Sequence, residues 1–164
     1  MSEVSVEALH RRLAELEAKE EIRAFIAEYC ARNDAIADIA GLVGMFAADA
    51  VMRNPAGSHN GREAIHTYYK SFFAGGTKFA RHHVINQVIT VVAPGLAHHD
   101  AYFIAMLGRE GESKVIFGRY ADTLVQRDER WWFQEKINDI VAPTTVQAGW
   151  AEGFGTHEPL TRSR

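Results

Sequence analysis

The N-terminal part of the chain has apolar residues at the spacing of an α-helix. From Ser5 to Arg32 they recur every three or four positions, with one slip of phase near Ala18–Glu20, and many of the other positions are Glu, Arg or Lys. The apolar stripe consists of Leu9, Leu13, Leu16, Ile22, Phe25, Ile26 and Tyr29. The pattern predicts one long helix, or two helices in tandem, ending at Asn33-Asp34.

Two shorter helical patterns follow. The segment Ile36–Phe46 predicts a short helix, and Gly61–Phe73 predicts a third one that Gly75-Gly76 ends. Between them, Ala50–Arg53 has the composition of a short strand, and the Asn, Pro and Gly of Asn54–Ser58 predict a turn.

The second half of the chain changes to the period of two that is typical of strands. Four such runs are present: His82–Val92, Leu96–Leu107, Lys114–Arg127 and Trp131–Ile140. The short links between them are rich in Gly, Pro, Asp and Glu, so we expect an antiparallel meander.

Helices followed by antiparallel strands indicate an α+β fold. We expect one domain over residues 1–142, in which a curved antiparallel sheet packs on three N-terminal helices, and an irregular C-terminal extension over residues 143–164. Such a curved sheet leaves a conical hollow between the layers, which is a usual place for a small-molecule site.

Composition removes several classes of function. The 164 residues are 47% hydrophobic and 24% charged, with a formal net charge of −3, which argues against a nucleic-acid binder and against an anionic-membrane binder. The lone cysteine, Cys30, excludes an internal disulfide and a four-cysteine zinc site. The charged, amphipathic N-terminus does not resemble a signal peptide, and no apolar run is long enough to span a membrane, so we expect a cytoplasmic protein.

The strand-like stretch FARHHVINQVITVV, residues 79–92, contains the most unusual polar residues of the sequence. Strand alternation would put His82, Asn86 and the valines between and after them on one face, and His83 on the other. If that face lines the hollow, Asn86 is a polar group in an apolar wall. An Asn bonded to the backbone at a bulge is the alternative.

Four segments together resemble the SnoaL-like branch of the nuclear-transport-factor-2-like superfamily, with patterns similar to scytalone dehydratase, hexachlorocyclohexane dehydrochlorinase and the small subunits of aromatic-ring dioxygenases. The segments are EIRAFIAEYCARNDAIADIAGLVGMFAADAV, NGREAIHTYY, RHHVINQVI and FGRYADTLVQRDERWWFQEKI. They span Glu21 to about Ile140. The resemblance implies a cone-shaped α+β barrel, a fold that hosts enzymes, binding proteins and subunits alike.

The resemblance implies a catalytic pair as well. The histidine of the family's H-x-x-x-N strand falls on His82, and the acidic residue after the first helix falls on Asp34. A neutral imidazole can accept a proton at neutral pH, and a carboxylate bonded to one ring nitrogen orients the ring and stabilises the imidazolium. Removing a C–H proton and expelling hydroxide or halide in this way needs no metal and no organic cofactor.

Other positions are implied to bind substrate. Tyr120 falls near a pocket amide of scytalone dehydratase, and Lys136 near a cation that assists the leaving group in the dehydrochlorinase. A tyrosine at the edge of the core and a solvated strand lysine are the structural alternatives. Asn33 and Asn54 stand near the places of the dehydratase's two tyrosines, which argues against the same substrate. Asn54 and Asn86 are, with Tyr120 and Lys136, the predicted substrate-binding residues.

Two functions remain open after these comparisons of pattern. One is a cofactor-independent lyase or isomerase for a small, largely apolar substrate, cyclic ones included. The other is a non-catalytic ligand-binding protein or a small subunit of a ring-hydroxylating dioxygenase. The tripeptide His98-His99-Asp100 is interpreted as a surface turn and not as a metal site, because adjacent strand residues face opposite ways.

The aromatic residues of the predicted sheet suggest self-association. The helices can cover only one face, so apolar side chains on the other face would stay exposed. The residues concerned are Phe103, Phe117, Trp131 and Trp132. We expect a homodimer or, next, a homotrimer.

Overall fold

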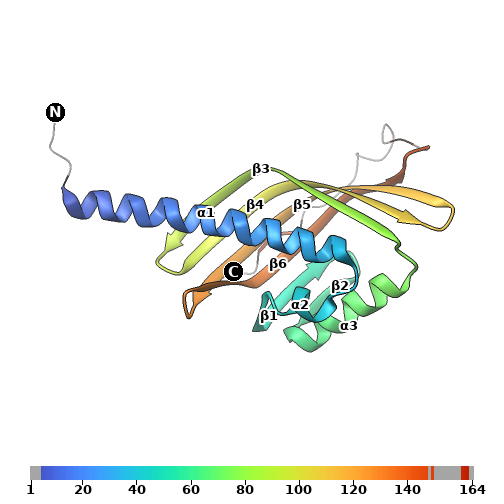
Figure 1. Cartoon of the computed structure of the whole chain (residues 1–164), viewed down its shortest axis with the longest axis horizontal. Coiled ribbons are helices and arrows are strands. Elements are labelled where there is room, and N and C mark those ends of the chain that lie inside the picture. Colours follow the sequence, from blue (N-terminus) through green and yellow to red (C-terminus); the bar gives the residue numbers. More distant parts are fainter. Residues whose placement is uncertain (1–4, 148, 150–159, 163–164) are drawn as a thin grey trace.

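A long helix crosses a curved, open sheet of six strands in the computed structural model, which describes residues 5–147, 149 and 160–162 (Figure 1). The elements are α1 Val6–Ala35, α2 Ile39–Val43, β1 Phe46–Asn54, β2 Gly57–Asn60, α3 Gly61–Ala74, β3 Phe79–Ala93, β4 Leu96–Arg109, β5 Glu112–Arg127 and β6 Arg130–Thr145. The α+β class predicted from the sequence is confirmed.

The sheet has the order β2-β1-β6-β5-β4-β3. Strands β3 to β6 form the predicted antiparallel meander, with short links between them. Strand β1 pairs with β6 in parallel and with β2 in an antiparallel hairpin, so the sheet is mixed at that edge. The sequence pattern missed β2 because its four residues, Gly57–Asn60, have the composition of a turn.

The helix boundaries differ from the prediction in two places. Helix α1 is one continuous helix, capped by Ser5, and it continues through Asn33 and Asp34 to Ala35. The expected helix over 36–46 shrinks to the five residues of α2, because Asp38 caps its start through the N–H of Gly41 and the chain enters β1 at Phe46.

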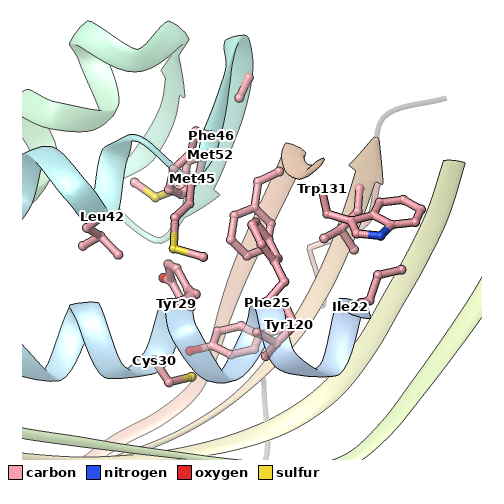
Figure 2. Close-up of a cluster of buried hydrophobic side chains, with 14 of the residues drawn as sticks. Ile22, Phe25, Tyr29, Cys30, Leu42, Met45, Phe46, Met52, Tyr120 and Trp131 are labelled. Carbon is pink, nitrogen blue, oxygen red and sulfur yellow. The ribbon is translucent and has the colours of Figure 1, made fainter. Parts of the chain in front are cut away.

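The core lies between the C-terminal half of α1 and the inner face of the sheet (Figure 2). Phe25 of α1 and Phe46 of β1 both pack on Phe133 of β6, with ring centroids 4.8 and 5.1 Å apart. In contrast, the apolar residues in the N-terminal half of α1 are at least half exposed: Val6, Leu9, Leu13 and Leu16. The predicted apolar stripe therefore divides at the phase slip, and only its second part enters the core. Among the described residues, no helix combines the length and the hydrophobicity needed to cross a bilayer.

The outer face of the sheet is apolar, but with other residues than those expected. Phe103 and Trp131 point inward and are only 5% and 4% exposed, because the strand alternation places them opposite α1. Phe117 and Trp132 are half-buried. The exposed apolar side chains of this face include Ile85, Val88, Tyr102 and Met106. Self-association stays a prediction.

Gly118 leaves the space that an aromatic stack needs. It lies opposite Phe103 in the ladder, and a Cβ at this position would stand 2.4 Å from the Phe103 ring and 2.8 Å from the carbonyl oxygen of Asp139. The free space lets the Phe103 ring stack on Tyr120, with centroids 4.3 Å apart.

Gly118→Ala is therefore expected to lower the free energy of unfolding by about 1–3 kcal/mol, because Phe103 has to leave its position in a packed interior. Urea denaturation measures the change. Gly111→Ala is not a suitable control, since Gly111 has φ +73°. Ala101→Gly, at a buried position of β4, measures the cost of removing one methyl group together with the added backbone entropy of glycine. An unchanged midpoint for Gly118→Ala would show that the stack adapts without cost.

Candidate active site

His82 and Asp34 form a hydrogen-bonded pair at the C-terminal end of α1. His82 Nδ1 lies 2.6 Å from Asp34 Oδ1, and the backbone N–H of His82 donates to Asp34 Oδ2 at 3.2 Å. The two side chains are only 11% and 15% exposed. The predicted contact between residues 48 positions apart is confirmed, and both carboxylate oxygens are used to hold one histidine.

The end of α1 places the carboxylate for this contact. Because the helix continues to Ala35, Asp34 sits on its last turn, and Ile36 closes that turn with a left-handed φ of 63° and an N–H bond to Asn33. His82 lies near the start of β3, on the face turned toward α1. A rigid helix end and a paired strand therefore fix both partners.

The dyad lies between two hollows. Its histidine borders an inner cavity of about 60 Å³, and both residues border a more open groove of about 340 Å³ between α1 and β3. The inner cavity is lined mainly by aromatic and aliphatic side chains with two amides: Tyr29, Asn33, Tyr68, Tyr69, Phe72, His82, Phe103, Ala105, Leu107, Ile116, Tyr120, Asn138 and Ile140. Tyr120 thus has the place at the cavity that the resemblance implied.

Phenol groups form a hydrogen-bonded pair in this cavity. The hydroxyls of Tyr29 and Tyr69 are 2.8 Å apart, and the side-chain amide of Asn33 donates to Tyr29 at 3.4 Å. Burial raises the pKa of Tyr29, Tyr69 and Tyr120, so all three stay protonated as neutral donors at physiological pH. Sequence reasoning missed both tyrosines, because Tyr29 belongs to the apolar stripe of the first predicted helix and Tyr69 lies on the apolar side of the predicted helix Gly61–Phe73.

Three charged or ionisable residues are wholly buried beneath the cavity. Lys136 Nζ lies 3.2 and 3.3 Å from the two carboxylate oxygens of Asp122, and His99 Nδ1 lies 3.0 Å from Asp122 Oδ2. The backbone N–H of Ile137 also donates to Asp122. The expected surface turn at His98-His99-Asp100 is wrong, since these residues are in β4 and His99 is 0% exposed.

Aromatic rings lie between Lys136 and the cavity. Its ammonium lies 3.6 Å from the centroid of the Tyr120 ring and 4.4 Å from that of Tyr29, and Lys136 is not among the cavity-lining residues. Burial lowers the pKa of Lys136, and the Asp122 carboxylate opposes this shift. The alternative of a solvated strand lysine is wrong, since Lys136 is 0% exposed, and a role of Lys136 in substrate binding stays a prediction.

The two remaining candidates lie outside the cavity. The ladder passes from the pair Ile85–Tyr102 to the pair Val88–Asp100, so Asn86 sits in a bulge, with a left-handed φ of 53° that asparagine tolerates better than most residues. It borders an outer hollow of about 630 Å³, and the expectation that it shares the face of His82 is wrong.

Asn54 is a turn residue. Its side-chain oxygen accepts the backbone N–H of Ala56 at 2.8 Å in the β1–β2 hairpin, which is a common role of asparagine. It does not line the cavity of His82.

Known proteins support the fold assignment. Residues 14–136 match the family described as SnoaL-like domain, and the chain belongs to this family. No curated protein sequence gives a significant match.

Solved structures of similar fold include two proteins from Novosphingobium aromaticivorans. A candidate scytalone dehydratase is 19% identical, with a TM-score of 0.76, 92% of this chain covered and 98% of that chain. A candidate aromatic ring hydroxylase is 20% identical, with a TM-score of 0.74 and coverages of 81% and 96%. A type 2 hexachlorocyclohexane dehydrochlorinase is 17% identical, with a TM-score of 0.74 and coverages of 82% and 93%. At these identities the likeness establishes the fold.

Lys136→Met is expected to destabilise the protein by about 3–5 kcal/mol, because it leaves the buried Asp122 carboxylate without its cation. The double variant Lys136→Met, Asp122→Asn removes both charges and should recover most of the loss. Urea denaturation of both variants measures the difference. Equal stability of the single and double variants would mean that the charge of Asp122 is neutralised by another group.

Cys30 should resist thiol reagents in the folded protein. Burial raises the pKa of its thiol to about 12, an effect that the Lys136 ammonium partly opposes. At pH 8 the thiolate population, and with it the rate of iodoacetamide labelling, should be roughly 10³-fold below that of a free cysteine. Labelling followed by mass spectrometry, with a urea-unfolded control, measures this. Rapid labelling without denaturant would contradict the burial of Cys30.

Proposed function

We propose that the protein is a lyase that removes a C–H proton from a small, largely apolar substrate, with His82 as general base and Asp34 as its orienting partner. The observation that carries the proposal is the 2.6 Å hydrogen bond between the two side chains at the edge of an aromatic cavity. The matching domain family and the dehydratase and dehydrochlorinase folds support it.

We propose the following proton positions. An ionised Asp34 accepts the Nδ1–H of His82, so the Nε2 of the same ring carries the lone pair. When Nε2 takes the substrate proton, the C–H electron pair becomes the new double bond, and the leaving group departs with its own bonding pair as hydroxide or halide. Asp34 then stabilises the imidazolium. If no group leaves and the proton returns to another carbon, the same proton abstraction gives an isomerisation instead.

The aromatic wall fits this chemistry. Tyr29 and Tyr69 offer phenol donors to a departing oxygen or halide, or to a carbonyl oxygen that gains negative charge. Tyr29 and Tyr69 would thus supply two phenol groups from two helices, whereas this chain has Asn33 and Asn54 at the places of the dehydratase's tyrosines. The Lys136 ammonium behind the Tyr29 and Tyr120 rings adds positive potential on the same side.

The cavity also limits the substrate. Its volume of about 60 Å³ is below the roughly 300–1,000 Å³ of most ligand pockets. The half-buried Tyr68 and Phe72 of α3 line it, so a substrate enters by displacing these rings or inserts only its reacting end. The stacked Phe103 and Tyr120 rings favour flat, apolar groups, cyclic ones included.

A ligand-binding role without catalysis is the second candidate. The aromatic lining alone would hold an apolar ligand, and the fold likeness to a candidate aromatic ring hydroxylase favours a role beside such an enzyme. In this case His82 and Asp34 would be a structural pair that ties α1 to β3.

Proton exchange separates the two candidates without knowledge of the substrate. Cyclohexanone, as a probe with acidic C–H groups, is incubated with the protein in D₂O, and loss of its α-proton NMR signals gives the exchange rate. Halogenated cyclohexanes test elimination, which NMR detects as the appearance of alkene signals. His82→Ala should abolish the acceleration, and Asp34→Asn should lower it roughly 10²–10⁴-fold. His83→Ala is the matched control, because His83 is exposed on the opposite face.

Two results would decide against the lyase. Unchanged rates in folded His82→Ala protein would exclude the dyad as the base. Saturable binding of the probes with no exchange or elimination would favour the ligand-binding role.

A further inference from the structure

The N-terminal half of α1 projects from the rest of the protein. The helix extends past the sheet in Figure 1, and from Ser5 to Glu17 every residue except Ala8 is exposed. Four apolar residues of this segment, called here the N-terminal seam, are 63, 50, 53 and 64% exposed: Val6, Leu9, Leu13 and Leu16. An apolar stripe of this kind is typical of a helix that packs on another element.

The seam has the spacing of a coiled coil. Its residues are separated by three, four and three positions, which are the a and d positions of two heptads. Glu20 and Arg23, the next a and d positions, form an ion pair with each other at 3.0 Å and end the pattern. The apolar surface is thus confined to the projecting part of the helix.

The seam faces away from the protein's own core. At 100° per residue, its centre lies about 150° around the helix from the centre of the buried set. That set consists of Ile22, Phe25, Ile26, Tyr29, Cys30 and Asn33. The same helix therefore buries one face in its own sheet and presents the other to a neighbour, and a second helix can lie along the seam without meeting the sheet.

We propose that the N-terminal seam pairs with the same seam of a second copy, as a parallel two-helix coiled coil. The flanking charges select this orientation. In a parallel pair, Arg12 at a g position faces Glu17 at the following e′ position of the second copy, and symmetry provides this contact twice. In an antiparallel pair, g faces g′ and Arg12 would meet the Arg12 of the second copy. Two heptads bury less than a standard interface, so we expect association in the micromolar range or weaker.

Sedimentation velocity of the full chain, from low micromolar to submillimolar concentration, should show a monomer–dimer equilibrium. Leu9→Gln with Leu13→Gln should leave only monomer, since Gln keeps helix propensity but removes the apolar contact. Ala14→Gln, on an exposed position outside the seam, is the matched control and should dimerise as the wild type does. A dimer that survives the double substitution would overturn the proposal.

Charge reversal tests the orientation. Arg12→Glu and Glu17→Arg, each alone, should raise the dimer dissociation constant about tenfold, because each turns two attractions into two repulsions, and the two together should restore it. In an antiparallel pair Arg12→Glu would not gain a repulsion against Glu17, and the double variant would not restore affinity.

Cross-linking gives the register. In a Cys30→Ala background, Leu9→Cys should form a disulfide between two copies under mild oxidation, because equivalent d positions lie within disulfide reach only in a parallel, in-register pair. Ala14→Cys should not. A dimer that instead dissociates on Tyr102→Gln, while the seam variants have no effect, would assign the interface to the outer face of the sheet and refute the pairing proposed here.

Discussion

The passage of α1 across the inner face of the sheet is the constraint on which the rest of the structure depends. The second half of the helix fills the core with Ile22, Phe25 and Ile26, and the same packing fixes where the helix ends. That end carries Asp34 to His82, and one turn earlier it carries Tyr29 to Tyr69. The dyad and the phenol pair are thus consequences of one apolar contact between a helix and a sheet.

The bonds that the buried charged groups form with one another explain why charge is tolerated below the cavity. Lys136, Asp122 and His99 lose their hydration in an interior where apolar residues of similar volume would pack as well or better. Their mutual bonds and the π faces of Tyr29 and Tyr120 offset part of that cost. In the proposed elimination, the Lys136 ammonium behind the Tyr29 and Tyr120 rings would stabilise the negative charge that develops in the cavity.

The proposed chemistry and the proposed pairing use opposite ends of α1. The C-terminal end is tied to β3 by the two hydrogen bonds that the Asp34 carboxylate accepts from His82. The N-terminal end is exposed from Ser5 to Glu17, Ala8 excepted, and is available to a second copy. The division falls at the phase slip near residues 18–20, where the apolar stripe moves from one side of the helix to the other.

The sequence by itself determined the class of fold, because the change from a helical period to a period of two and the turn residues between the strands are local signals. The sequence also identified His82 and Asp34 as candidates, since both fall on positions of the family pattern that it resembles. Only the tertiary structure decided the rest of the site. Asn86 left the predicted face because one extra residue in a strand reverses the alternation, and this depends on the pairing of β3 with β4. Contacts between elements far apart in the chain determine the positions of Tyr29, Tyr69 and Lys136. The hydrophobic spacing along one element carries no information on which residues pack against it.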